Sequence, residues 1–230
     1  MTHPEGRRVT EPRHGSWSSA RPGAMTTDVV LLRHGDTRLT PERRFSGTGS
    51  GDPGLSPEGR DQAGRAARGA LFRSTAFATV LCSPLRRCRE TAAIVAAELD
   101  LPVVVEDDLR EADFGAWEGL TFPEVERRHP VDLAAWQRSA DVPPTGSTES
   151  FRDVFDRVAG ALDRLRSGYP GAAVLAVTHV TPIKAFVAHA LGAPPMAFFS
   201  MELSSAAVCR ISYTGEDRLL RSFNDTSHLG

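Results

Sequence analysis

The stretch Val29-Val30-Leu31-Leu32-Arg33-His34-Gly35 decides the fold, because an apolar run passes here directly into two basic residues and a glycine. A short, unbroken run of β-branched and aliphatic residues predicts a strand that is buried on both faces, as in a parallel sheet. Gly35 lets the backbone turn sharply and approach a ligand closely. The end of this strand is therefore the first candidate for a functional site.

Downstream of this stretch, strand-like and helix-like segments alternate. Ser56 with Pro57 and Glu58 has the pattern of a helix start, namely an N-cap, a first-turn proline and a first-turn acid. The alternation predicts an α/β fold, a three-layer sandwich with a mostly parallel central sheet flanked by helices. We expect strands at 77–82, 103–106 and 173–178, helices at 57–72, 84–99, 151–166 and 182–191, short helices at 121–139, a loop at 141–149, and two or three partly antiparallel strands at 198–223.

Composition limits the classes of partner. The chain has 27 basic and 29 acidic residues, a net charge of −2 that gives no general reason to expect nucleic acid or a membrane surface as partner. No apolar run approaches the roughly 20 residues of a membrane-spanning helix. The three cysteines (Cys82, Cys88 and Cys209) have no zinc-like spacing and predict free thiols. Together these features indicate a cytoplasmic protein.

Residues 1–24 differ from the rest of the chain. They are rich in proline, glycine, serine and arginine, lack periodicity and lack the apolar core of a secretory signal. We expect a disordered tail at 1–24 and one domain at 25–230, with Met25 as a plausible start. The tail also contains Arg13-His14-Gly15, but no strand precedes this triplet, so we interpret it as a chance repeat.

Two further segments follow predicted strands as Arg33-His34 does, namely Ser83-Pro84-Leu85-Arg86 and Thr178-His179. Ligands bind beyond the carboxyl ends of strands in open parallel sheets, so these segments are expected to meet. Two histidines and two arginines would then form a positive pocket, and arginine binds phosphate bidentately. Taken alone, His34 could equally be a structural histidine at a strand end. Arg87 and Arg89 are predicted to be solvated.

With its neighbours, the chain resembles the histidine phosphatase superfamily, the phosphoglycerate-mutase-like proteins, over about residues 28–225. Five blocks carry the resemblance in order, and together they are far more specific than any one of them. They are Leu31-Leu32-Arg33-His34-Gly35-Asp36-Thr37, Leu55-Ser56-Pro57-Glu58-Gly59 with Gln62-Ala63, Ser83-Pro84-Leu85-Arg86 with Thr91-Ala92, Leu109-Arg110-Glu111-Ala112-Asp113-Phe114-Gly115-Ala116-Trp117-Glu118-Gly119, and Val177-Thr178-His179.

The resemblance implies a role for each matching position. His34 matches the nucleophile that becomes phosphohistidine, and Glu111 matches the general acid and base. The groups implied to contact the phosphoryl oxygens are Arg33, Arg86 and His179. Substrate-binding positions are implied at Thr40, Ser46, Gly47 and Glu149, although Thr40 replaces the asparagine that is more usual there.

The chemistry of these roles follows from the residue types. A neutral imidazole can attack phosphorus without a separate base, provided that its other nitrogen keeps the proton, for example against a backbone carbonyl. The covalent intermediate divides hydrolysis into two displacements. Arg33, Arg86 and a protonated His179 would stabilise the transferring group, so we expect neither metal nor cofactor. The expected substrate is a small phosphorylated metabolite.

Two alternatives remain at this point: a phosphoglycerate mutase, and a phosphate-binding module without catalysis. Mutases of this family carry a Trp-Asn pair soon after Arg-His-Gly, where this chain has Arg38-Leu39-Thr40. The segment at 113–117 instead resembles the phosphatase branch, which includes α-ribazole phosphatases, broad acid phosphatases and a domain that actinobacteria fuse to ribonuclease H. The oligomeric state stays open. We expect specificity to lie in a variable insert at 120–150, with Arg127, Arg128, His129, Trp136 and Arg138 as candidate contacts.

Overall fold

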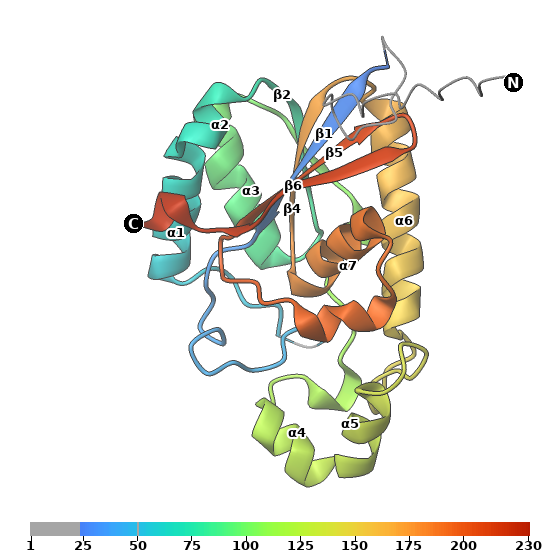
Figure 1. The fold of residues 1–230 in the computed structure, drawn as a ribbon. Coiled ribbons are helices and arrows are strands. Elements are labelled where there is room, and N and C mark those ends of the chain that lie inside the picture. Colours follow the sequence, from blue (N-terminus) through green and yellow to red (C-terminus); the bar gives the residue numbers. More distant parts are fainter. Residues whose placement is uncertain (1–23, 50) are drawn as a thin grey trace, which may run out of the picture.

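The computed structural model describes residues 24–49 and 51–230, and within them six strands form one sheet of order β3-β2-β4-β1-β5-β6 (Figure 1). The pairs β1–β4, β2–β4 and β2–β3 are parallel, whereas β5 pairs antiparallel with β1 and β6. The mostly parallel sheet is confirmed, and the C-terminal segment forms two strands. The bounds are β1 (Thr26–Arg33), β2 (Phe77–Cys82), β3 (Val103–Val105), β4 (Ala173–Thr178), β5 (Val208–Thr214) and β6 (Asp217–Asp225).

Helices cover both faces of the sheet, which confirms the three-layer sandwich (Figure 1). One face carries α1 (Pro57–Arg68), α2 (Ala70–Ser74) and α3 (Arg86–Leu99), and the other carries α6 (Phe151–Gly168) and α7 (Val180–Leu191). The N-cap predicted for α1 is present, since Ser56 Oγ accepts a hydrogen bond from Gly59 N at 3.0 Å. The helix predicted at 57–72 is interrupted, because the backbone of Gly69 is extended.

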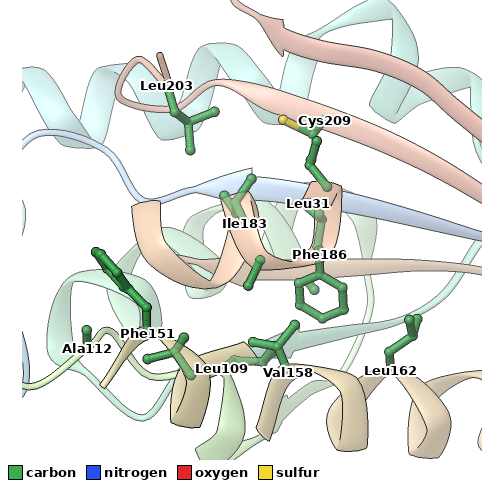
Figure 2. Close-up of a cluster of buried hydrophobic side chains, with 14 of the residues drawn as sticks. Leu31, Leu109, Ala112, Phe151, Val158, Leu162, Ile183, Phe186, Leu203 and Cys209 are labelled. Atoms are coloured by element: carbon green, nitrogen blue, oxygen red, sulfur yellow. The ribbon is translucent and has the colours of Figure 1, made fainter. Parts of the chain in front are cut away.

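The alternation of side chains along β1 divides the core in two. Val29 and Leu31 point to the side of α6 and α7, whereas Val30 and Leu32 pack with α1 and α3. Figure 2 shows the first cluster, in which Leu31 lies near side chains of α6 and α7. Because all four of these β1 residues are at most 1% exposed, β1 is the doubly buried strand that its sequence predicts.

The segment between β3 and α6 lies beyond the carboxyl ends of the parallel strands (Figure 1). It contains the short helices η1 (Asp107–Leu109), η2 (Gly115–Trp117), α4 (Phe122–Arg128) and α5 (Pro130–Trp136). The break between α4 and α5 falls at Pro130, as predicted. Two more 3₁₀ helices, η3 (Pro195–Ser200) and η4 (Ser227–Leu229), follow α7 and β6.

Other expectations meet the structure in different ways. The bounds of β2 and β4 coincide with the prediction, while α3 begins two residues later than expected, at Arg86. The tail predicted at 1–24 lies outside the described residues except for Ala24. None of the helices in the described part of the chain is long and apolar enough to cross a membrane.

Candidate active site

Three strand ends form the floor of the site. In the sheet order β2-β4-β1, these parallel strands end side by side, so the residues after them converge. His34 N donates to Thr178 O and Ser83 N donates to Val177 O, both at 3.0 Å. The rings of His34 and His179 lie 5.1 Å apart between centroids. The predicted convergence of these segments is therefore what the fold produces.

His34 is buried, and its ring is oriented by its own backbone neighbour. Its Nδ1 lies 2.7 Å from Gly35 O. A carbonyl can only accept, so Nδ1 carries the proton and Nε2 keeps its lone pair. Burial, with the positive charges of Arg87 and Arg33, lowers the pKa of His34 well below 6.5. At neutral pH the imidazole is therefore uncharged, with a nitrogen free to act as a nucleophile.

His179 is fully buried behind His34. Its Nε2 lies 2.7 Å from Ser83 Oγ and 3.3 Å from Cys88 Sγ. Burial lowers the pKa of His179 well below 6.5, and Arg87 is the next largest cause. The groups around His179 therefore favour its neutral form, and the expected protonated form needs a nearby anion.

The structure corrects the assignment of the second arginine. Arg86 is 63% exposed and pairs with Glu90 one helical turn away, at 2.8 Å. Arg87, predicted to be solvated, is only 1% exposed, and its charge lowers the pKa of both histidines. Its Nη2 donates to Ser46 O at 2.8 Å. Arg87, not Arg86, therefore provides the second guanidinium of the site.

The helical pattern of α3 contains the signal that identifies Arg87. Residues 88, 91, 92, 95 and 96 are buried, and Arg87 belongs to the same face because it precedes Thr91 by one turn. Arg86 precedes Glu90, which is on the solvent side. The prediction of Arg86 rested on its position next to Ser83-Pro84-Leu85 and did not use this helical periodicity.

Two guanidinium groups in the site have unused donors. Arg33 Nη1 donates to Leu203 O at 2.7 Å, but within the described residues Arg33 Nε and Arg87 Nε are buried without a hydrogen-bond partner. Buried donors are nearly always paired in native proteins, so each unpaired one needs an explanation. An oxyanion bound beside the two histidines would provide the missing acceptors.

The side chain of Glu111 lies against the N-terminus of α7, and only 5% of the surface of this residue is exposed. Its Oε2 accepts from Val180 N at 3.1 Å, and its Oε1 accepts from Thr181 N at 3.2 Å and from Ala112 N at 2.9 Å. The first two donors are at the positive end of the helix dipole, where a carboxylate is stabilised. Glu111 and His179 thus lie at the same helix terminus, and Glu111 lines the cavity beside His34.

An ion-pair network that sequence analysis missed fixes the loop before Glu111. Arg157 of α6 donates to Glu111 O at 3.1 Å, to Arg110 O at 2.8 Å and to Asp108 O at 2.7 Å. Its Nε also donates to Glu149 Oε1 at 2.8 Å. Only the position of Arg157 beside the apolar stripe of α6 could have indicated that it is buried.

Glu149 is part of this network and not of the cavity wall. It binds Arg110 at 3.0 Å and Arg157, and its Oε2 accepts from Asp113 N at 3.1 Å. The substrate contact predicted for Glu149 therefore has no support in the geometry. Its carboxylate is already used to position the loop that carries Glu111.

The glycines of the site allow backbones to approach each other. A Cβ on Gly35 would lie 2.2 Å from Gly59 O, and a Cβ on Gly47 would lie 2.0 Å from Ala112 O. The φ angle of Gly35 is not positive, so its backbone conformation does not require glycine. The close contact with the start of α1 does require it. Gly47 N donates to both oxygens of Glu118, at 2.9 and 3.0 Å. Gly47 was predicted to bind substrate, but it does not line the cavity over His34, and its N–H instead ties the loop after β1 to Glu118.

A cavity of about 810 Å³ opens above these groups. Thr40 and Ser46 line it, as their predicted roles require. Of the candidate contacts from the insert, Trp136 lines it, whereas the three arginines and His129 do not. Its walls are formed by Arg33, His34, Asp36, Thr37, Leu39, Thr40, Arg43, Arg44, Phe45, Ser46, Gln62, Glu111, Phe114, Phe122, Trp136, Val180, Thr181, Phe198, Phe199, Glu202, Leu203, Ser204, Ser205 and Leu229.

The chain is similar to known proteins in sequence and in fold. The family model of the histidine phosphatase superfamily (branch 1) matches residues 29–226. Phosphoserine phosphatase 1 of Hydrogenobacter thermophilus is 30% identical over 202 residues, which cover 88% of this chain and 94% of that protein. A bifunctional protein of Mycobacterium tuberculosis is 42% identical over 219 residues, 95% of this chain. This chain covers 58% of the length of that mycobacterial relative.

Solved structures share the fold. A phosphoserine phosphatase of Entamoeba histolytica, a histidine-to-alanine variant in complex with phosphoserine, has a TM-score of 0.79 and 26% identity. The match covers 89% of this chain and all of that one. The shared fold therefore covers most of this chain.

Proposed function

Because the chain belongs to the histidine phosphatase superfamily, we propose that it hydrolyses small phosphate monoesters through a phosphohistidine intermediate on His34. Family membership and phosphatase relatives support phosphatase activity in general. The observation that carries the mechanism is the neutral imidazole of His34, which keeps its Nε2 free beside two guanidinium groups with unpaired donors.

In the first step, His34 Nε2 forms a bond to phosphorus while the bond from phosphorus to the alcohol oxygen breaks. Arg33 and Arg87 bind the equatorial oxygens and stabilise the charge that spreads over them. Glu111, which must first take up a proton beside the bound phosphate dianion, gives that proton to the departing alkoxide. The phosphate dianion also favours a proton on His179, because a nearby opposite charge stabilises the imidazolium.

In the second step, water attacks the phosphorus of phosphohistidine and the nitrogen–phosphorus bond breaks. Glu111, now ionised, accepts a proton from that water, so the same residue serves as acid and base. The network of Arg157 and Glu149 supports this role because it fixes the backbone on both sides of Glu111. The side chains of the site supply the positive charge, and the proposed reaction therefore uses no metal.

The test is the release of p-nitrophenol from p-nitrophenyl phosphate by the wild type and by His34→Ala, with a chelator present. We expect His34→Ala to lower the rate at least about a thousandfold, because it removes the nucleophile. His129→Ala, which changes a histidine outside the cavity, should keep wild-type activity. Hydrolysis that survives in His34→Ala, or that requires added metal, would contradict the mechanism.

Rapid quenching at neutral pH, followed by intact-mass analysis, tests the intermediate directly. The wild type should gain the mass of one phosphoryl group, and His34→Ala should not. A mutase would instead interconvert phosphoglycerates faster than it releases phosphate, and comparing these two rates on 3-phosphoglycerate separates the two activities.

A further inference from the structure

The cavity over His34 has an aromatic wall that the proposed chemistry does not use. It comes from Phe122 of α4 and from Phe198 and Phe199 of η3, with Trp136 of α5, which is 3% exposed, packed against Phe199. Phe122 and Phe199 are each 41% exposed, so two large rings are in contact with water at the entrance of a phosphate site. A small polar ester would leave this apolar surface uncovered.

The aromatic wall is held in place before any ligand binds. Trp136 and Phe199 pack edge to face with centroids 5.0 Å apart, and Phe198 and Phe199 do so at 5.2 Å. Lys184 of α7 holds η3 in place. Its Nζ donates to Phe198 O at 3.2 Å and lies 4.2 Å from the centre of the Phe198 ring. A preorganised surface loses little conformational entropy when a flat ligand covers it.

The charged side chains that line the cavity would bind an anionic group on the leaving alcohol only weakly. Arg44 is already engaged by Glu42, by Glu124 at 3.0 Å and by Gly119 O at 2.7 Å. Arg43 is exposed, so water screens its charge, and the exposed carboxylate of Glu202 lines the same cavity. A carboxylate on the leaving group would therefore meet the screened Arg43, the already paired Arg44, and the acidic side chains of Asp36 and Glu202.

We propose that the leaving alcohol of the substrate carries an aromatic or similarly flat apolar group, which binds against the exposed rings of Phe122 and Phe199 in the cavity over His34. This inference rests on the proposed phosphatase function and names the substrate class of the same site. Apolar and aromatic residues with a few convergent polar groups are the usual lining of a pocket for such ligands.

The test compares three phosphate esters of primary alcohols: 2-phenylethyl phosphate, n-propyl phosphate and phosphoserine. Their leaving groups are all primary alkoxides, so differences in kcat/KM report mainly on the cavity. We expect 2-phenylethyl phosphate to exceed n-propyl phosphate by about tenfold, the effect of one or two aromatic contacts. Phe199→Ala and Phe122→Ala should each remove a large part of this preference. Leu219→Ala, a change at a residue of β6 that is 48% exposed, should leave it unchanged.

Binding measured by calorimetry keeps the inference separate from catalysis. The non-hydrolysable 2-phenylethylphosphonate should bind about tenfold more tightly than n-propylphosphonate, and Phe199→Ala should reduce this difference. A preference for phosphoserine, or equal values for the phenyl and propyl compounds, would overturn the aromatic class and leave phosphatase activity standing. Selective phosphonate binding without hydrolysis of any ester would support the aromatic site and overturn the proposed function.

Discussion

Arg86 and Arg87 are neighbours of the same type in opposite environments. Arg86 extends into water and pairs with Glu90, whereas Arg87 is buried and donates to Ser46 O. A surface pair such as Arg86–Glu90 contributes about 0–1 kcal/mol to folding. The buried Arg87, by contrast, has an unpaired Nε–H beside two histidines. The two arginines therefore form a matched pair for testing which one binds phosphate.

We expect Arg87→Met to lower kcat by about a hundredfold or more, because it removes a preorganised donor to the transferring group. Arg86→Met should change kcat less than about twofold, since surface changes away from the site have small effects. Steady-state kinetics on p-nitrophenyl phosphate distinguish the two variants. The assignment would be reversed if Arg86→Met were the slower enzyme.

We expect Glu149 and Arg157 to act as positioning residues, since they bind backbone groups on both sides of the Glu111 side chain. We expect Glu149→Gln to lower kcat about tenfold and to leave KM nearly unchanged, because a small misplacement of a catalytic group affects mainly the transition state. Glu98→Gln, an exposed change on α3, is the control for loss of one negative charge. A rise in KM with unchanged kcat would instead indicate that Glu149 contacts substrate.

At the scale of elements, the contact between the loop after β1 and the start of α1 depends on two glycines. A Cβ on Gly59 would lie 2.0 Å from Asp36 O, a backbone atom that cannot move alone. A Cβ on Gly64, in the same helix, would meet only the end of the Arg68 side chain, at 3.2 Å.

Gly59→Ala is therefore expected to lower the free energy of unfolding by about 2 kcal/mol or more, as overpacking does. Gly64→Ala should raise it by about 0.5–1 kcal/mol, because alanine favours a helix more than glycine does. Urea denaturation measures both. Equal effects of the two substitutions would contradict the close backbone contact.

The elements were predictable from sequence where local chemistry determines them. The apolar run of β4 and the Ser56-Pro57 start of α1 produce the expected bounds. The break at Gly69 was missed because a single glycine inside an alanine-rich helix pattern is usually tolerated. Gly35 was assigned to a turn, whereas its actual neighbour is Gly59, a contact between distant segments that no local pattern contains.

The candidate site was predictable to a similar degree. Arg33 and His34 lie at the end of β1 and His179 follows β4, so they meet at the carboxyl edge of the sheet. Glu111, between η1 and η2, joins them through hydrogen bonds to the start of α7. Glu149 could not be assigned correctly, since its partners come from η1 and α6 and only the tertiary structure brings them together.

For the whole molecule, burial of neutral histidines makes stability depend on pH. In the unfolded chain, His34 and His179 take up protons near their ordinary pKa of 6.5, whereas the native pKa of each is lowered well below that value. Below pH 6.5 the unfolded state therefore binds more protons, and the free energy of unfolding falls as pH falls. The loss approaches about 1.4 kcal/mol per pH unit for each histidine until its native pKa is reached.

Urea denaturation at pH 7.5, 6.5 and 5.5 should show this decline, and saturating inorganic phosphate should reduce it by favouring the protonated histidines in the native state. A double variant, His34→Phe with His179→Phe, should show a smaller slope if it folds. If the double variant does not fold, the effect of phosphate on the wild-type slope is the measurement to use. Stability that stays constant or rises from pH 7.5 to 5.5 would contradict the buried neutral pair.

The place of β1 in the sheet has a consequence for how the chain is made. This strand ends directly before His34 and is translated before its partners β4 and β5. The side chains of Thr26 and Thr214, which are in contact, are 188 positions apart. At about 5–20 residues per second, the ribosome needs some 10–40 s after β1 to complete β5, its antiparallel neighbour. During that interval an apolar strand has no native neighbours, so a chaperone that shields residues 26–33 should raise the yield of active protein.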